Sequence, residues 1–227
     1  MVEIFAKIRI LRAFATIVRE PTRVDKVLEV SDAIRARYRR EGKTLRLPLF
    51  DEPDFIEIFE KRYHPPMNLS ELRKLPAGTF GRPVVDFLDL NGLDPSALPH
   101  IEGSDPVDYL MARVRRTHDL IHVLTEYGTS PEDEMALQSF LIAQMSLPVA
   151  AFSIAAGILH FLVYQPTELY RVFGLLNDGY NRGLRARRLL TAPLEEYWKR
   201  DLHELRTELG VVPPLNSRVK GASLARG

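Results

Sequence analysis

The 227-residue sequence contains no cysteine, a single tryptophan and almost no net charge, with 31 Lys and Arg against 30 Asp and Glu. Without cysteine there are no disulfides, thiolate zinc sites, iron–sulfur clusters or cysteine nucleophiles, so any metal ion must be held by His, Asp and Glu. A formal net charge of +1 argues against nucleic acid as a partner, because nucleic-acid binding requires a surplus of Lys and Arg. Apolar side chains make up 45% of the chain, which excludes disorder over most of its length.

The first twenty residues lack the features of a cleavable signal sequence. Arg9, Arg12 and Arg19 interrupt the apolar residues there, so no continuous apolar segment remains. The apolar positions recur with helical spacing, which predicts an amphipathic helix that either packs on the core or lies on a membrane surface. We therefore expect a bacterial-type chain that resides in the cytoplasm.

Long apolar runs are also scarce, and the longest covers residues 147–164. Ser153 and His160 are the strongly polar side chains among its eighteen positions, a length near the lower limit for a membrane span. Pro148 opens the run and many of its residues are small, so a buried central helix is the favoured interpretation. A second hypothesis is that the small side chains leave room for a long apolar ligand.

Proline and glycine divide the chain into segments with helical periodicity, and no segment alternates in the manner of a strand. Ser104 is predicted to cap a long helix that Gly128 ends, and Ser130 is predicted to cap the next. The sequence thus predicts an all-α fold for residues 1–227, a single-domain multi-helix bundle with a polar tail at 215–227. The expected helices cover about 1–20, 22–40, 54–62, 83–91, 104–127, 131–146, 148–165, 166–190 and 193–209.

The candidate functional residues begin on the long central helix. His118 and His122 are four residues apart, so their imidazoles lie on one face of the helix and can share an ion. Asp119 lies about 100° further round the helix, where it is either a third ligand or orients one from behind.

A further ligand is predicted from the neighbouring helix. Glu134 follows His122 by twelve residues, and on one continuous helix it would lie about 18 Å away. The turn at 128–131 instead lets the second helix fold back, so that its first turn comes close to the histidines. Two imidazoles and two carboxylates suit zinc best, with iron, manganese, cobalt and magnesium as alternatives. The competing interpretation is that these are ordinary packed or surface side chains.

The motif and several flanking blocks resemble one known family. His118-Asp119-x-x-His122, followed after eleven residues by Glu134, is similar to the metal signature of the coenzyme Q biosynthesis protein four family. The resemblance covers about residues 75–214 and is weaker before them. Its other parts are Gly78-Thr79-Phe80-Gly81 with Phe87-Leu88, Arg113, Arg115, Leu147-Pro148, and Trp198 with 205–210.

The resemblance implies a metal-dependent protein of ubiquinone biosynthesis. It implies binding of a polyprenylated hydroxybenzoate-type lipid, and a lyase activity in which decarboxylation at ring C1 is coupled to hydroxylation. His118, Asp119, His122 and Glu134 would then be both the metal ligands and the catalytic residues, with zinc as the usual ion. The implied partners are a polyprenyl lipid or prenylated quinone precursor, other quinone-biosynthesis proteins and the membrane surface. The implied location is peripheral, at the inner membrane, and the oligomeric state stays open, with a homodimer among the alternatives.

Two other functions remain open on the sequence. The first is a non-catalytic isoprenoid-lipid-binding scaffold for quinone-biosynthesis enzymes, which would share the fold. The second is a helical His-Asp-type metal phosphohydrolase, for which His100 and Asp178 would be the additional ligands, although His122 and Glu134 would then have no role. A basic cluster at Arg182, Arg185, Arg187 and Arg188 is either a site for a lipid phosphate or a solvated helix face.

Overall fold

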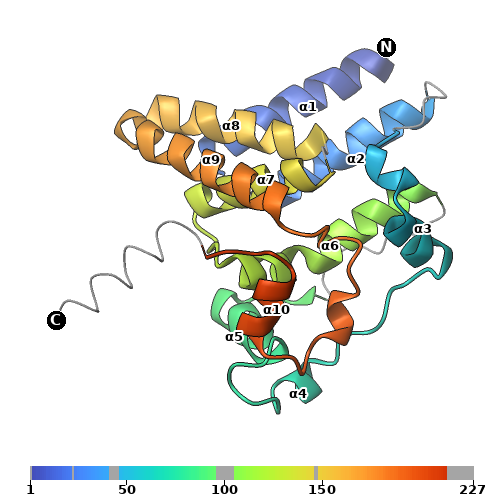
Figure 1. Cartoon of the computed structure of the whole chain (residues 1–227). Coiled ribbons are helices and arrows are strands. Elements are labelled where there is room, and N and C mark those ends of the chain that lie inside the picture. The colour runs from blue at the N-terminus through green and yellow to red at the C-terminus, as the bar shows by residue number, and fades with distance from the viewer. Residues whose placement is uncertain (1, 22, 41–45, 96–104, 146–147, 214–227) are drawn as a thin grey trace. The chain divides into compact units, whose positions relative to one another are not determined.

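The computed structural model describes residues 2–21, 23–40, 46–95, 105–145 and 148–213. Across these ranges it contains ten α-helices, three short 3-10 helices and no strand, only one isolated β-bridge (Figure 1). The predicted all-α fold is therefore confirmed. The chain divides into two compact units, each built from two separate stretches of sequence: Met1–Arg46 with Thr129–Gly183, and Leu47–Gly128 with Leu184–Gly227. That the two units form one domain stays a prediction.

The first unit is a helical bundle arranged around α8. Its helices are α1 (Val2–Arg19), α2 (Val24–Arg40), α7 (Pro131–Met145), α8 (Pro148–Tyr164) and α9 (Leu169–Arg185), the last preceded by the 3-10 turn η3 (Pro166–Glu168). Helix α8 packs against α1, α2 and α7. Ile17, Val18 and Ala156 form one buried cluster, and Met135, Phe161 and Val172 form another.

Two glycines let α9 approach α7 closely. A Cβ atom at Gly179 would collide with the backbone carbonyl oxygen of Ala136, and one at Gly183 would collide with the carbonyl oxygen of Phe140. The helices are also joined by hydrogen bonds, because the Gln144 Nε2 group donates to the Gly183 carbonyl at 2.7 Å. Small side chains thus fix the spacing of this helix pair.

The prediction of a buried central helix at 148–164 is only partly right. One face of α8 is buried, including Ala156, Gly157 and Phe161, whereas Leu162 and Val163 are more than half exposed. None of the helices in the described ranges has the length and apolar character that crossing a membrane requires.

The second unit contains the helix that carries the candidate ligands. Its elements are η1 (Pro48–Asp51), α3 (Pro53–Glu60), α4 (Leu69–Leu72), α5 (Gly81–Asn91), α6 (Pro106–Thr125), η4 (Leu194–Glu196) and α10 (Leu202–Glu208). Helix α5 packs on α6, and Val84, Leu88 and Leu120 are fully buried there. Gly92 ends α5 in a left-handed conformation, directly after the predicted helix end at residue 91.

Two details of the long helix differ from the prediction. The cap of α6 is Asp105, whose side chain accepts a hydrogen bond from the Asp108 amide at 2.8 Å; Ser104 lies outside the described residues. The helix ends at Thr125 with Glu126 in the left-handed region, so Gly128 is not its terminating residue. A glutamate in this conformation is uncommon and is held there by its contacts.

The single helix predicted at 193–209 is wrong. The structure has the short elements η4 and α10 there, separated by a turn and a bend at Trp198–Arg200. The carbonyls of this segment bind the start of α5 instead. The Phe80 amide donates to the Arg200 carbonyl at 2.8 Å, and the Gly81 amide donates to the Trp198 carbonyl at 2.9 Å. Tertiary pairing therefore outweighs the local helical pattern.

Candidate metal centre

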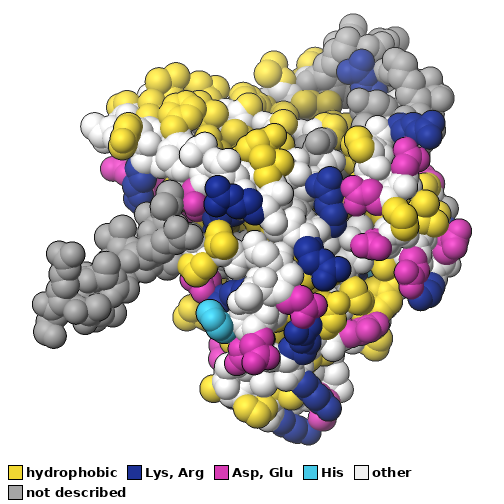
Figure 2. Space-filling model, in the orientation of Figure 1, with side chains coloured by type: hydrophobic (Ala, Val, Ile, Leu, Met, Phe, Trp, Pro, Cys, Tyr) yellow, Lys and Arg dark blue, Asp and Glu magenta, His cyan; other side chains and the backbone are white. Residues whose placement is uncertain are grey.

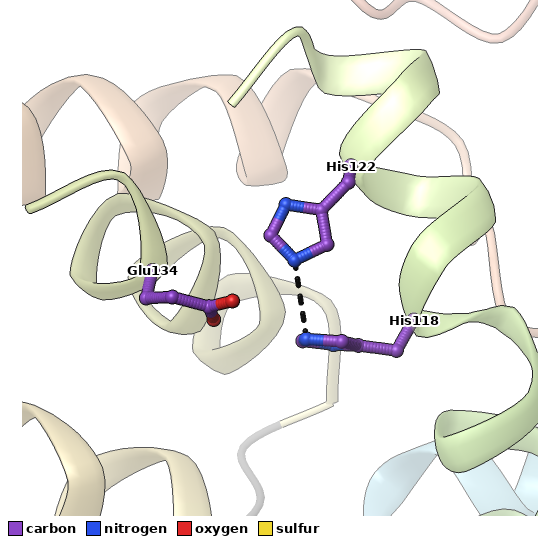
Figure 3. A group of neighbouring side chains, drawn as sticks. All are labelled: His118, His122 and Glu134. Atoms are coloured by element: carbon purple, nitrogen blue, oxygen red, sulfur yellow. Dashed lines mark hydrogen bonds between the residues drawn. The ribbon is translucent and has the colours of Figure 1, made fainter. Parts of the chain in front are cut away.

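The two histidines lie in the second half of α6 and face each other. Their Nε2 atoms are 3.2 Å apart, and this contact is the dashed line in Figure 3. The spacing of four residues places the rings one above the other on the helix surface, as expected. The centroid separation is 4.7 Å and the rings are nearly perpendicular.

His122 contacts a backbone carbonyl and an aromatic ring. Its Nδ1 atom donates a hydrogen bond to the Tyr127 carbonyl at 3.0 Å, and its ring stacks on Phe87 with centroids 5.2 Å apart. The side chain is buried, whereas His118 is half-buried. Because the carbonyl fixes the proton on Nδ1, the Nε2 atom of His122 offers a lone pair toward His118.

Glu134 lies in the first turn of α7, directly after the turn that joins it to α6. Ser130 caps that helix, because its hydroxyl accepts from the Asp133 amide at 3.2 Å and donates to the Asp133 carboxylate at 3.1 Å. His118, His122 and Glu134 each offer one ligand atom, and these atoms lie within 4.8 Å of one another. Figure 3 shows the Glu134 carboxylate pointing toward the imidazoles.

Three of the four predicted ligands are thus brought together. Asp119 is half-buried on α6 and is not part of this group of ligand atoms in the described chain. Its role as a ligand stays a prediction. Of the residues nominated for a phosphohydrolase, His100 lies outside the described residues, and Asp178 lies 3.8 Å from Arg182 on α9.

The donor set suits a divalent ion. Ligand atoms around one tetrahedral ion lie about 2.0–2.2 Å from it, and hence roughly 3.3–3.6 Å from one another. The ligand atoms here all lie within 4.8 Å of one another, and the two Nε2 atoms are 3.2 Å apart. Two imidazoles with one carboxylate leave a coordination position open, which is the pattern of catalytic rather than structural zinc sites.

Some residues of the site could not be identified from the sequence. The Tyr127 carbonyl is a backbone group that any residue would provide, and Phe87 comes from a different helix.

The basic cluster near the end of α9 does not form one exposed site. Arg182 is buried beside Asp178, Arg188 pairs with Glu52 at 3.2 Å, and Arg187 lies 3.8 Å from Glu208.

These features define a class of protein: an all-helical chain in which two histidines one turn apart and a following glutamate make a metal-type site. A family model matches nearly the whole chain, over residues 8–215, and so identifies the protein more narrowly than the site alone. The chain belongs to the coenzyme Q (ubiquinone) biosynthesis protein Coq4 family. The predicted resemblance is confirmed, and the match also includes most of the residues before 75, for which a weaker likeness is predicted.

Curated relatives support the assignment. The chain is 36% identical over 157 residues to the mitochondrial ubiquinone biosynthesis protein coq-4 of Neurospora crassa, covering 67% of this chain and 44% of that protein. It is 32% identical over 191 residues to the mitochondrial COQ4 homolog of Bos taurus, covering 81% and 70%. The chain thus spans less than half of the fungal protein.

A solved structure supports the fold. The crystal structure of a protein described as a ubiquinone biosynthesis protein, from Nostoc punctiforme PCC 73102, superposes with a TM-score of 0.76 at 25% identity. The superposition covers 91% of this chain and 96% of that one.

Proposed function

We propose that this chain is a metal-dependent protein of ubiquinone or prenylquinone biosynthesis. It binds a polyprenylated hydroxybenzoate-type lipid and acts as a lyase at ring C1, with His118, Asp119, His122 and Glu134 holding a divalent ion, most simply zinc. The observation that carries the proposal is the convergence of His118, His122 and Glu134 in a chain of the Coq4 family.

The reaction requires that a carboxylate leave and a hydroxyl take its place. The bond between ring C1 and the carboxyl carbon breaks, carbon dioxide departs, and its electron pair stays on the ring. A two-electron oxygen-atom donor of the peroxide class then delivers the hydroxyl oxygen and is itself reduced. A bound divalent ion supplies Lewis-acid stabilisation of the negative charge that develops.

The residues of this chain supply positioning and desolvation. His122 presents a fixed Nε2 lone pair because its other nitrogen is bonded to the Tyr127 carbonyl. Burial of His122 against Phe87 keeps water from that side, which strengthens charge interactions with a bound carboxylate. Glu134 adds a negative charge that offsets part of the charge of a divalent ion.

The test compares ligand variants with a matched histidine. His118→Ala, His122→Ala and Glu134→Ala are expected to lose bound metal in native mass spectrometry and ubiquinone production in cells that depend on this chain. His203→Ala, an exposed histidine on α10, should keep both. If the His118 and Glu134 variants retain both metal and quinone production, the proposal is wrong.

An exposed apolar surface supports a second function, that of a lipid-binding scaffold at the membrane surface for other quinone-biosynthesis proteins. Figure 2 shows hydrophobic side chains gathered at the upper left, where Figure 1 places α8 and α9. The exposed large apolar residues of these two helices lie between positions 159 and 184. They are Leu159, Leu162, Val163, Tyr164, Tyr170, Phe173, Tyr180 and Leu184.

Vesicle flotation tests this membrane role. The double variant Leu162→Asp, Val163→Asp should lose binding to vesicles of phosphatidylcholine with an anionic phospholipid, because two charges would enter the apolar face. Leu90→Asp changes a leucine on α5 that is even more exposed than Leu162, and this variant should float like the unaltered protein. Equal flotation of all three proteins would refute a membrane contact through α8.

A further inference from the structure

The C-terminal end of α6 is closed by a side chain from α10. Arg206 donates from Nη2 to the Val123 carbonyl at 2.6 Å and from Nε to the Leu124 carbonyl at 2.9 Å. These carbonyls belong to the last turn, where the helix itself provides no partners. Arg206 therefore caps α6 from a position about eighty residues further along the chain.

The same arginine holds the chain reversal that follows the helix. Its Nη1 atom lies 2.6 Å from the Glu126 carboxylate, and Glu126 has φ 59° and ψ 21°. This left-handed conformation is unfavourable for a residue with a side chain, so the surrounding contacts must maintain it. The reversal brings the next carbonyl, that of Tyr127, to 3.0 Å from Nδ1 of His122.

We infer that Arg206 is a positioning residue for His122, an inference that rests on the proposed metal function. By fixing the end of α6, Arg206 keeps the Tyr127 carbonyl next to Nδ1 of His122. A carbonyl oxygen can only accept a hydrogen bond, so Nδ1 must carry the proton. The Nε2 atom of His122 is then unprotonated and directed at His118. In the metal-free chain, the proton between the two Nε2 atoms accordingly comes from His118.

The experiment reads the tautomers directly, by long-range ¹H–¹⁵N NMR of the full chain without metal. In the unaltered protein, His122 should be protonated at Nδ1 and His118 at Nε2. Arg206→Ala should convert His122 to a mixture of tautomers and weaken cobalt(II) binding about 10- to 100-fold. His160 is an internal reference, because its Nδ1 donates to the Val18 carbonyl at 2.8 Å and should not change.

Two control variants separate positioning from stability. Arg200→Ala removes an exposed arginine that pairs with Glu208 at 2.6 Å, and it should leave both readouts unchanged. Glu126→Gly removes the carboxylate but favours the left-handed backbone, so His122 should stay protonated at Nδ1. If His122 in Glu126→Gly is no longer protonated at Nδ1, then the contacts of Arg206 with the Val123 and Leu124 carbonyls are not what positions His122. Arg206→Gln is the substitute should the alanine variant not fold.

Retention of the Nδ1 proton on His122 together with unchanged cobalt affinity in the Arg206 variant would overturn the inference. The outcome is distinguishable from failure of the proposed function. If the unaltered protein binds no cobalt, the metal proposal fails, yet the tautomer of His122 in the metal-free chain still decides the role of Arg206.

Discussion

Arg113 and Glu195 form an ion pair in which neither side chain is exposed to solvent. The Arg113 Nη1 and Glu195 Oε1 atoms are 2.6 Å apart, and the Arg113 Nη2 group also donates to the Ala192 carbonyl at 3.1 Å. Arg116 adds a second contact to the same carboxylate oxygen at 3.2 Å. The pair joins the helix of the candidate ligands to the 190–195 segment, so it fixes α6 within its unit.

Removal of the carboxylate should destabilise the protein strongly. Glu195→Ala would leave the Arg113 guanidinium buried without its partner, which typically lowers the free energy of unfolding by about 3–5 kcal/mol. Glu208→Ala removes a carboxylate that pairs with Arg200 at the surface, and its effect should be small, because exposed ion pairs contribute little to stability. Denaturant unfolding of the two variants measures the difference. If both variants lose the same free energy of unfolding, then water solvates the Arg113 guanidinium once Glu195 is removed.

The elements with strong local signals could be predicted from the sequence. The helices at 2–19, 131–145 and 148–164 have continuous apolar periodicity or a proline at their first position. The His118–His122 pair could be predicted because a spacing of four residues determines which helix face both occupy. Glu134 could be proposed because the turn before it ends one helix and a capping serine begins the next.

The parts that could not be predicted depend on distant contacts. The break at Trp198–Arg200 follows from backbone pairing with Phe80 and Gly81, which no local pattern reveals. The end of α6 at Glu126 depends on Arg206, and a left-handed glutamate gives no signal in the sequence. The exposed face of α8 was missed because an apolar pattern alone does not distinguish a buried face from an exposed one.

Substitution of Gly179 should separate α7 and α9. In Gly179→Ala, the new methyl group would collide with the Ala136 backbone, which should lower the free energy of unfolding by about 1–3 kcal/mol. Gly174→Ala is the matched control on the same helix, because a Cβ atom there meets nothing within 4 Å. It should stabilise the protein by about 0.5–1 kcal/mol. Thermal unfolding distinguishes these opposite signs.

Alkaline stability should depend on Tyr109. Burial raises the pKa of Tyr109 to about 12, above its ordinary value near 10. The stability from keeping this phenol neutral is therefore fully present below pH 10 and is lost as the pH rises toward 12. Tyr109→Phe should flatten the decline in denaturant stability over that range, whereas Tyr170→Phe, at a fully exposed site, should not. An unchanged slope in the Tyr109 variant would contradict this expectation.

A divalent ion that binds the folded chain should raise its stability by mass action. At a free zinc concentration of 100 times the dissociation constant, the gain is about 2.7 kcal/mol. The gain should disappear in His122→Ala, because the buried imidazole is the ligand whose lone pair is fixed by the Tyr127 carbonyl. His203→Ala is the control, because it changes an exposed side chain and should keep the full gain. His160→Ala would not serve, because His160 is buried. Thermal unfolding with and without a chelator measures all three proteins, and an equal zinc response in the His122 and His203 variants would place the ion elsewhere on the chain.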